Sequence, residues 1–96
     1  MHSAIRAATM RGRCPRYLGI SGDGDSASIG LGQFAHSVRR GVNMVYIVAN
    51  NGVYGLTKGQ FSATSDKGAK SKKGALNKDE AIDLVGMALQ LGATFV

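Results

Sequence analysis

The chain has 96 residues, a formal net charge of +6, fourteen glycines and one cysteine, Cys14. This length allows one small domain, which buries only about 60–65% of the surface that its unfolded chain exposes. A lone cysteine excludes an internal disulfide, and without further ligands at suitable spacing it excludes a zinc or iron–sulfur site, so we expect a reducing, cytoplasmic location. The apolar runs are too short to cross a bilayer, and we expect no membrane association.

The first residues differ in composition from the rest of the chain. Residues 1–16 contain four arginines and no acidic residue. We interpret them as an atypical basic N-terminal segment and not as a transit peptide, which they resemble only faintly. The predicted domain covers residues 17–96.

Residues 17–49 predict a strand, a helix and a second strand. The apolar run of residues 17–21 leads into Gly22, and apolar residues then recur at helical spacing from Ile29 to Val38. Arginines and Gly41 mark the end of that helix. Within residues 42–49, residues 44–48 form a continuous apolar run rich in β-branched residues, which is typical of a parallel strand covered on both faces. The predicted fold class is therefore α/β with a parallel sheet.

The C-terminal half predicts a long loop and a second helix. Residues 50–76 show no clear period, and a loop of this length is usually functional or disordered. Asn77 followed by Glu80 predicts a capped helix start, and Gly92 predicts its end. Residues 93–96 look like the start of a further strand, so we expect an incomplete domain that is a fragment of a longer chain or depends on a partner.

Two polar motifs stand where the predicted strands end: Gly-Asp-Gly-Asp at residues 22–25 and the pair Asn50-Asn51. Carboxylates repel phosphate, so a phosphate-binding turn with two aspartates is favourable only if a divalent cation lies between them. Amide oxygens from the second motif suit Mg²⁺, which prefers six oxygen ligands. A dinucleotide fingerprint also fits residues 22–27 formally, but the acid it requires for the ribose is missing between Asp25 and Asp66.

The two motifs and their separation resemble the thiamine-diphosphate motif. Residues 51–60 are similar in particular to the β subunits of 2-oxoacid:ferredoxin oxidoreductases. The resemblance implies a partial thiamine-diphosphate-binding (diphosphate) domain over residues 17–96. It implies that the protein ligands of Mg²⁺ are Asp23, Asn51 and the carbonyl of Val53. It also implies that the diphosphate is lined by Gly22, Gly24, Asp25, Gly55, Leu56 and Thr57.

The same resemblance implies oxidative decarboxylation of a 2-oxo acid to an acyl-coenzyme A, with ferredoxin as electron acceptor and thiamine diphosphate and Mg²⁺ as cofactors. The glutamate that activates the cofactor comes from another domain in that family, so a companion subunit carrying the pyrimidine-binding domain is expected. No catalytic residue is predicted in this chain, and the isolated chain is expected to be inactive.

Two alternatives remain open. One keeps the cofactor but uses non-oxidative chemistry, as in acetolactate synthases or decarboxylases. The other is a basic nucleic-acid-binding module that uses Lys70, Lys72 and Lys73, which is disfavoured because no aromatic residues interleave to stack on bases.

Overall fold

The computed structural model describes residues 10–12, 15–57 and 59–96. Most of the predicted basic segment, residues 1–16, lies outside the described residues. Cys14 lies outside them too.

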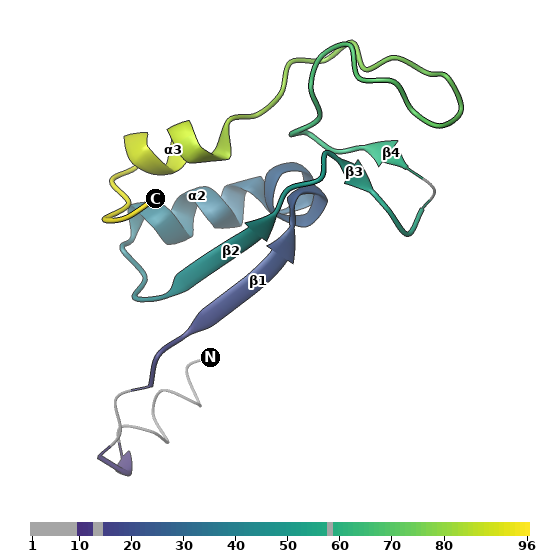
Figure 1. Ribbon diagram of the computed structural model, residues 1–96. Helices are drawn as coiled ribbons and strands as arrows, with labels where there is room; N and C mark the ends of the chain where they lie inside the picture. The colour runs from purple at the N-terminus through teal and green to yellow at the C-terminus, as the bar shows by residue number, and fades with distance from the viewer. Residues whose placement is uncertain (1–9, 13–14, 58) are drawn as a thin grey trace.

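Two parallel strands form the centre of the molecule (Figure 1). β1 spans Leu18–Gly22 and β2 spans Val45–Ala49. Their register pairs Leu18 with Val45 and Gly22 with Ala49, so both strands end at the same edge. The predicted α/β class with a parallel sheet is confirmed.

The helix between the strands is divided into two parts. A π-helix, η1, spans Gly24–Ile29, and an α-helix, α2, spans Leu31–Arg39. The break is at Gly30, whose N–H donates to the Asp25 carbonyl at 2.6 Å. A Cβ at Gly30 would lie 2.7 Å from that carbonyl oxygen, so the wider turn requires glycine. The predicted end of the helix is confirmed, since Gly41 follows it with φ +63°.

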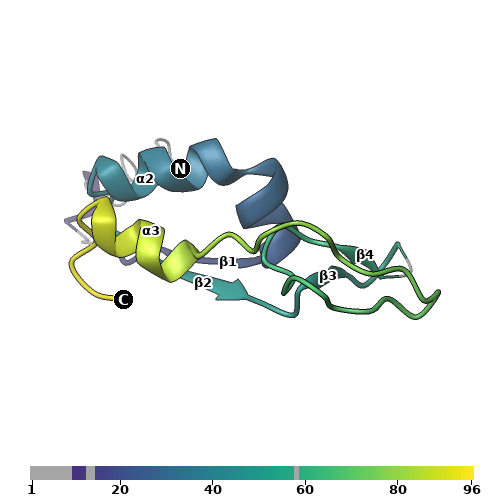
Figure 2. The same ribbon diagram turned by 90° about the horizontal axis from the view of Figure 1, so that it is seen from above.

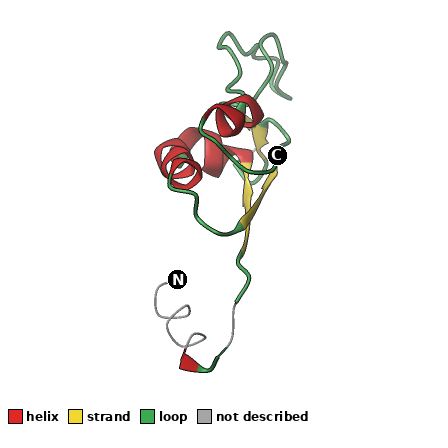
Figure 3. Ribbon diagram, turned by 90° about the vertical axis from the view of Figure 1, so that its left-hand side faces the viewer, coloured by secondary structure: helices red, strands yellow, loops and turns green. Residues whose placement is uncertain are grey.

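The helices α2 and α3 (Leu84–Gln90) lie on the same face of the strand pair, as Figures 2 and 3 show. Tyr46 of β2 faces α2, and its ring centroid lies 6.3 Å from that of Phe34. Gly19 of β1 makes room for this ring, because a Cβ there would lie 2.6 Å from Tyr46 Cδ2.

The opposite face of the strand pair is exposed. Its apolar residues are paired in register, and their exposed fractions range from 47% to 68%: Leu18, Ile20, Val45 and Ile47. The expectation that residues 42–49 are covered on both faces is therefore wrong for the described part of the chain. The physical reason is that both described α-helices lie on the other side of the strands.

The long polar stretch contains more structure than its composition predicts. β3 (Val53–Tyr54) pairs in antiparallel fashion with β4 (Gln60–Phe61), and a single bridge joins Lys70 to Leu76. Strands of two residues are too short to produce an alternating pattern in the sequence. Three polar side chains of this stretch are nevertheless buried, namely Ser62, Thr64 and Ser65.

The predicted start of the second helix is wrong. α3 begins at Leu84, where Asp83 is the N-cap and accepts a hydrogen bond from the Gly86 N–H at 2.9 Å. Asn77 is instead buried, and its amide donates to the Ser65 and Asp66 carbonyls at 3.0 and 3.2 Å. Its Oδ1 accepts the Asp79 N–H at 3.2 Å, but this local turn does not continue into a helix. Gly92, with φ +90°, ends α3 as predicted, but residues 93–96 form no strand.

Apolar burial is slight among the described residues. Only Ala27 and Ala88 are buried hydrophobic residues, whereas six polar residues are buried. No described helix has the length and hydropathy needed to cross a membrane.

Candidate functional site

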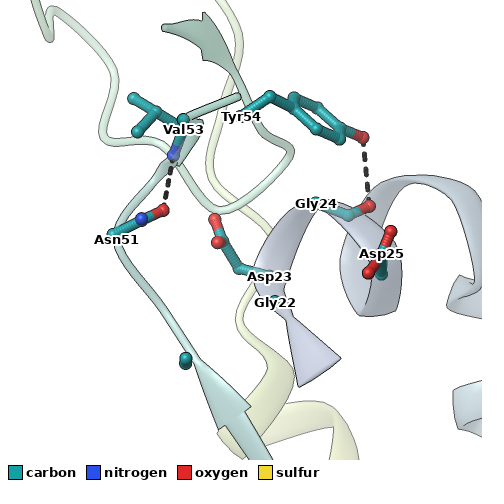
Figure 4. A pocket seen from close by; sticks show the side chains of 9 residues that line it. Gly22, Asp23, Gly24, Asp25, Asn51, Val53 and Tyr54 are labelled. Atoms are coloured by element: carbon teal, nitrogen blue, oxygen red, sulfur yellow. Dashed lines mark hydrogen bonds between the residues drawn. The ribbon is translucent and has the colours of Figure 1, made fainter. Parts of the chain in front are cut away.

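A cavity of about 260 Å³ opens at the edge where both parallel strands end. This is the usual position for ligands in α/β sheets. Its lining joins the two motifs that the sequence singles out: Gly22, Asp23, Gly24, Asp25, Ala49, Asn51, Val53, Tyr54 and Gly55. Figure 4 shows the Asp23 carboxylate between the turn that carries Asn51 and the start of η1.

Among the residues that the structure describes, Asp23 is the large side chain that is fully buried, with 2% exposure. Its Oδ2 accepts a hydrogen bond from the Gly52 N–H at 3.0 Å and one from the Thr64 hydroxyl at 2.6 Å. The Ser62 hydroxyl donates to the same oxygen. Each of these donors favours the charged form of the carboxyl group.

Burial and hydrogen bonding act on Asp23 in opposite directions. Burial raises the pKa of Asp23, whereas the hydroxyls of Ser62 and Thr64 and the nearby backbone N–H groups lower it. The hydrogen bonds prevail, and the pKa of Asp23 lies below its ordinary value of 3.8. The site therefore contains a buried carboxylate that is charged at neutral pH.

Asn51 forms a tight turn across the cavity from Asp23. Its Oδ1 accepts the N–H of Val53 at 3.1 Å, as the dashed line in Figure 4 marks. This hydrogen bond orients the amide of Asn51 and leaves a second lone pair on Oδ1. Val53 lies at the start of β3 and also lines the cavity.

The glycines of the site differ in their surroundings. A Cβ at Gly24 would lie 2.4 Å from Cε1 of Tyr54, whose hydroxyl donates to the Gly24 carbonyl at 3.0 Å. The protein itself therefore requires glycine at this position. At Gly22 and Gly55 a Cβ would meet nothing within 4 Å. Both line the cavity, so their missing side chains enlarge the space open to a ligand.

Two predicted cofactor-binding residues lie outside the cavity lining. Leu56 is fully exposed, at 100%. The hydroxyl of Thr57 contacts Oε1 of Gln60 at 3.1 Å and the Tyr54 carbonyl at 3.4 Å, within the turn between β3 and β4. The structure brings the other seven predicted residues together, and the roles assigned to all nine stay predictions.

Comparison with known proteins now adds to this geometry. The sequence model of the family described as thiamine pyrophosphate enzyme, C-terminal TPP binding domain, matches residues 3–96. The chain belongs to this family. The TPP-binding domain is thus the fold that presents the cavity at the ends of β1 and β2.

Within this family, the chain is similar to β subunits of 2-oxoacid oxidoreductases. The chain is 49% identical over 78 residues to the 2-oxoacid:ferredoxin oxidoreductase subunit beta of Saccharolobus solfataricus, covering 78% of this chain and 25% of that protein. It is 42% identical over 78 residues to the 2-oxoglutarate oxidoreductase subunit KorB of Mycobacterium tuberculosis, covering 80% and 21%. The chain thus spans a quarter or less of the length of these two relatives.

A solved structure agrees with these relatives. The 2-oxoglutarate:ferredoxin oxidoreductase from Magnetococcus marinus, solved with 2-oxoglutarate, coenzyme A and succinyl-CoA bound, superposes with a TM-score of 0.71. The identity is 33%, and the match covers 97% of this chain and 32% of that chain. The fold of this TPP-binding domain is therefore that of a segment of the larger enzyme chain.

The chemistry of the cavity in this TPP-binding domain fits a metal–diphosphate group. No cluster of three His, Cys, Asp or Glu side chains occurs within residues 10–12, 15–57 and 59–96. The predicted protein ligands are one carboxylate, one amide oxygen and one carbonyl oxygen, so phosphate oxygens and water are needed to complete an octahedron. The open space beside Gly22 and Gly55 is available for them.

The sequence did not predict the two residues whose hydroxyls donate to Asp23. Ser62 and Thr64 lie 39 and 41 residues further along the chain and are 5% and 8% exposed. Ser and Thr in a polar loop are usually exposed to solvent. Their hydrogen bonds to a carboxylate far away in the chain produce no pattern in the neighbouring sequence. The only sequence signal is their position in the stretch that follows Asn51.

Proposed function

We propose that this chain is the thiamine-diphosphate-anchoring part of a 2-oxoacid:ferredoxin oxidoreductase β subunit. In this proposal the metal ligands are Asp23, Asn51 and the carbonyl of Val53. The observation that carries it is the convergence of Asp23 and the Asn51 turn on one cavity at the ends of two parallel strands. The names of the relatives favour the ferredoxin-dependent reaction over non-oxidative thiamine chemistry.

Different residues of the chain hold the metal ion and the diphosphate of the cofactor. The charged Asp23 attracts Mg²⁺, and the oriented amide of Asn51 adds a neutral oxygen. Gly22, Gly24, Asp25 and Gly55, which all line the cavity, would hold the diphosphate. Leu56 and Thr57 contribute through the turn that follows. The bound cofactor supplies the electron sink for decarboxylation, and the protein orients it.

The proposal extends to the partners of the chain. A companion subunit supplies the pyrimidine-binding domain, ferredoxin accepts the electrons, and coenzyme A accepts the acyl group released from the 2-oxo acid. The whole reaction takes place in the cytoplasm. The chain forms a fragment of the β subunit, and by itself it is expected to bind cofactor without turnover.

Calorimetric titration of thiamine diphosphate into the chain, with and without Mg²⁺, tests the anchoring role. We expect binding to require Mg²⁺ and to weaken by about ten- to a hundredfold in Asp23→Ala and Asn51→Ala, as for loss of an interaction with a charged group. Asp79→Ala and Asn43→Ala are controls, because both side chains are exposed and outside the cavity. Binding that is indifferent to Mg²⁺ or to both site substitutions would refute the proposal.

Ferredoxin reduction tests the reaction class. The chain assembled with its companion subunit should reduce ferredoxin when given a 2-oxo acid and coenzyme A. Release of an aldehyde or a carboligation product without ferredoxin reduction would point to the non-oxidative alternative.

A further inference from the structure

The Asp23 carboxylate uses its two oxygens differently. The N–H of Gly52 and the hydroxyls of Ser62 and Thr64 all donate to Oδ2. All three hydrogen bonds that the structure describes for the Asp23 carboxylate end on Oδ2. Because Asp23 lines the cavity, the arrangement holds one oxygen in the protein and leaves the other for a ligand.

Three donors on one oxygen restrict rotation of the carboxylate. Turning the group about its Cβ–Cγ bond would break the hydrogen bonds from Ser62 and Thr64 inside a buried network, which is costly. The donors therefore fix the direction of Oδ1 as well as of Oδ2. A metal that requires strict ligand geometry benefits from such fixing more than a tolerant metal does.

Ser62 also holds the opposite side of the cavity. Its N–H donates to the Gly52 carbonyl at 3.0 Å, while its hydroxyl donates to Asp23. Gly52 stands between Asn51 and Val53, and its own N–H donates to Asp23. One serine thus sets the separation between the carboxylate and the turn that carries the other two predicted ligands.

Thr64 connects the same network to the second motif. Its hydroxyl lies 2.6 Å from Asp23 Oδ2, 2.8 Å from the Asn50 side-chain oxygen and 2.8 Å from the Ser62 hydroxyl. Each hydroxyl has a single proton, and Ser62 and Thr64 both give theirs to Asp23, so Asn50 joins the network by turning its amide NH₂ toward a lone pair of the Thr64 hydroxyl. The network thereby joins Asp23 to Asn50, which directly precedes the metal-binding turn.

We propose that Ser62 and Thr64 are positioning residues that aim Oδ1 of Asp23 at the metal and set the spacing between Asp23 and Asn51. The inference rests on the proposed function, because it assumes that Asp23 binds the cation of the cofactor. It assigns the serine–threonine pair a part in selecting Mg²⁺ over the larger and more tolerant Ca²⁺.

The test compares binding of thiamine diphosphate supported by Mg²⁺ with binding supported by Ca²⁺. In Ser62→Ala and Thr64→Val we expect the Mg²⁺-supported affinity to fall about ten- to a hundredfold, as for loss of a partner that orients a metal ligand. The Ca²⁺-supported affinity should fall much less, because Ca²⁺ accepts variable geometry. Thr64→Ser keeps the hydroxyl and should restore the wild-type ratio of the two affinities.

Ser65→Ala is the matched control, because Ser65 is buried in the same loop and none of the described hydrogen bonds joins its side chain to Asp23. Partial unfolding of a variant lowers both affinities by the same factor and leaves their ratio unchanged. An unchanged ratio in Ser62→Ala and Thr64→Val would therefore overturn the positioning role, whatever the size of the common loss. Failure of the wild-type chain to bind the cofactor with either ion would instead refute the proposed function.

Discussion

Asp23 combines burial with a negative charge, and this combination makes the stability of the chain depend on pH. Its pKa is lowered on folding, so the charged carboxylate stabilises the folded state fully above the ordinary value of 3.8. As the pH falls through the lower folded value, the carboxylate is protonated and this stabilisation is lost.

We therefore expect the free energy of unfolding to decrease as the pH falls below about 4, with Asp23 responsible for part of the decrease. Urea titrations at a series of pH values measure it. Asp23→Asn should flatten this dependence on pH. Equal slopes in wild type and Asp23→Asn would contradict this account.

Substitutions of two site glycines should have different effects on the stability of the fold and on cofactor binding. Gly24→Ala places a methyl group 2.4 Å from Tyr54 Cε1, and we expect it to destabilise the fold by about 1–3 kcal/mol. Gly22→Ala meets no protein atom, so the free energy of unfolding should change by only about 0.5 kcal/mol or less.

Cofactor titration completes this comparison. If the diphosphate occupies the space beside Gly22, the Gly22→Ala variant should bind thiamine diphosphate and Mg²⁺ more weakly despite its normal stability. Tyr54→Ala should relieve the clash of Gly24→Ala, and a double-mutant cycle measures how much. Full affinity in Gly22→Ala would place the ligand elsewhere.

Among the elements, α3 shows how a local signal can mislead. Asn77 and Glu80 have the spacing of a capping box, yet the helix starts seven residues later, at Leu84. The Asp83 carboxylate accepts the N–H of Gly86 in the first turn of α3, and a Cβ at Gly86 would lie 2.4 Å from Asp83 Oδ2, so a side chain there would displace the capping carboxylate. We expect Asp83→Ala to cost about 1 kcal/mol of stability, measured by urea unfolding.

Substitution at Glu80 is the control for this capping prediction. Glu80 is exposed and pairs with Lys67, so Glu80→Ala should change the stability by about 0–1 kcal/mol. If Glu80→Ala lowered the free energy of unfolding more than Asp83→Ala does, the capping box predicted from the sequence would be supported instead.

The elements that the sequence predicts best are those with long periodic patterns and strong end signals. The apolar runs of β1 and β2, the helical spacing before Gly41 and the two polar motifs all lie in the predicted order. The π-helix η1 before Gly30 was not predicted, because one extra residue in a helical turn barely changes the spacing of the apolar residues. The contacts of Ser62, Thr64 and Asn77 escaped it because they join residues far apart in the chain.

At the scale of the molecule, the buried side chains among the described residues are mostly polar, and three of them, Asp23, Ser62 and Thr64, form the hydrogen-bonded network of the site. Asp23, Ser26, Ser62, Thr64, Ser65 and Asn77 are buried, against two alanines. Hydrogen bonds of this kind contribute little net stability each, while apolar burial is the main driving force of folding. The described part of the chain should therefore be only marginally stable without a ligand.

Ligand binding should raise this stability strongly. At a hundred times the dissociation constant, a ligand specific for the folded state adds about 2.7 kcal/mol, which corresponds to roughly 10 °C or more in Tm for a domain of this size. We expect this shift with thiamine diphosphate and Mg²⁺ together, and a far smaller one with either alone. Thermal unfolding followed by circular dichroism measures it, and an equal shift with thiamine diphosphate alone would contradict a metal-bridged site.

The pairing of Gly22 with Ala49 also sets the distance between the two motifs of the site. Asp23 follows one strand by one residue and Asn51 follows the other by two, so the register of the strands sets how far apart these side chains start. A slip of one residue shifts a strand by about 3.3 Å, more than the 2.0–2.1 Å length of a bond from Mg²⁺ to oxygen. The segment between α2 and β2 can therefore vary in length without moving the site, whereas one residue inserted into either strand would separate the two halves of the site.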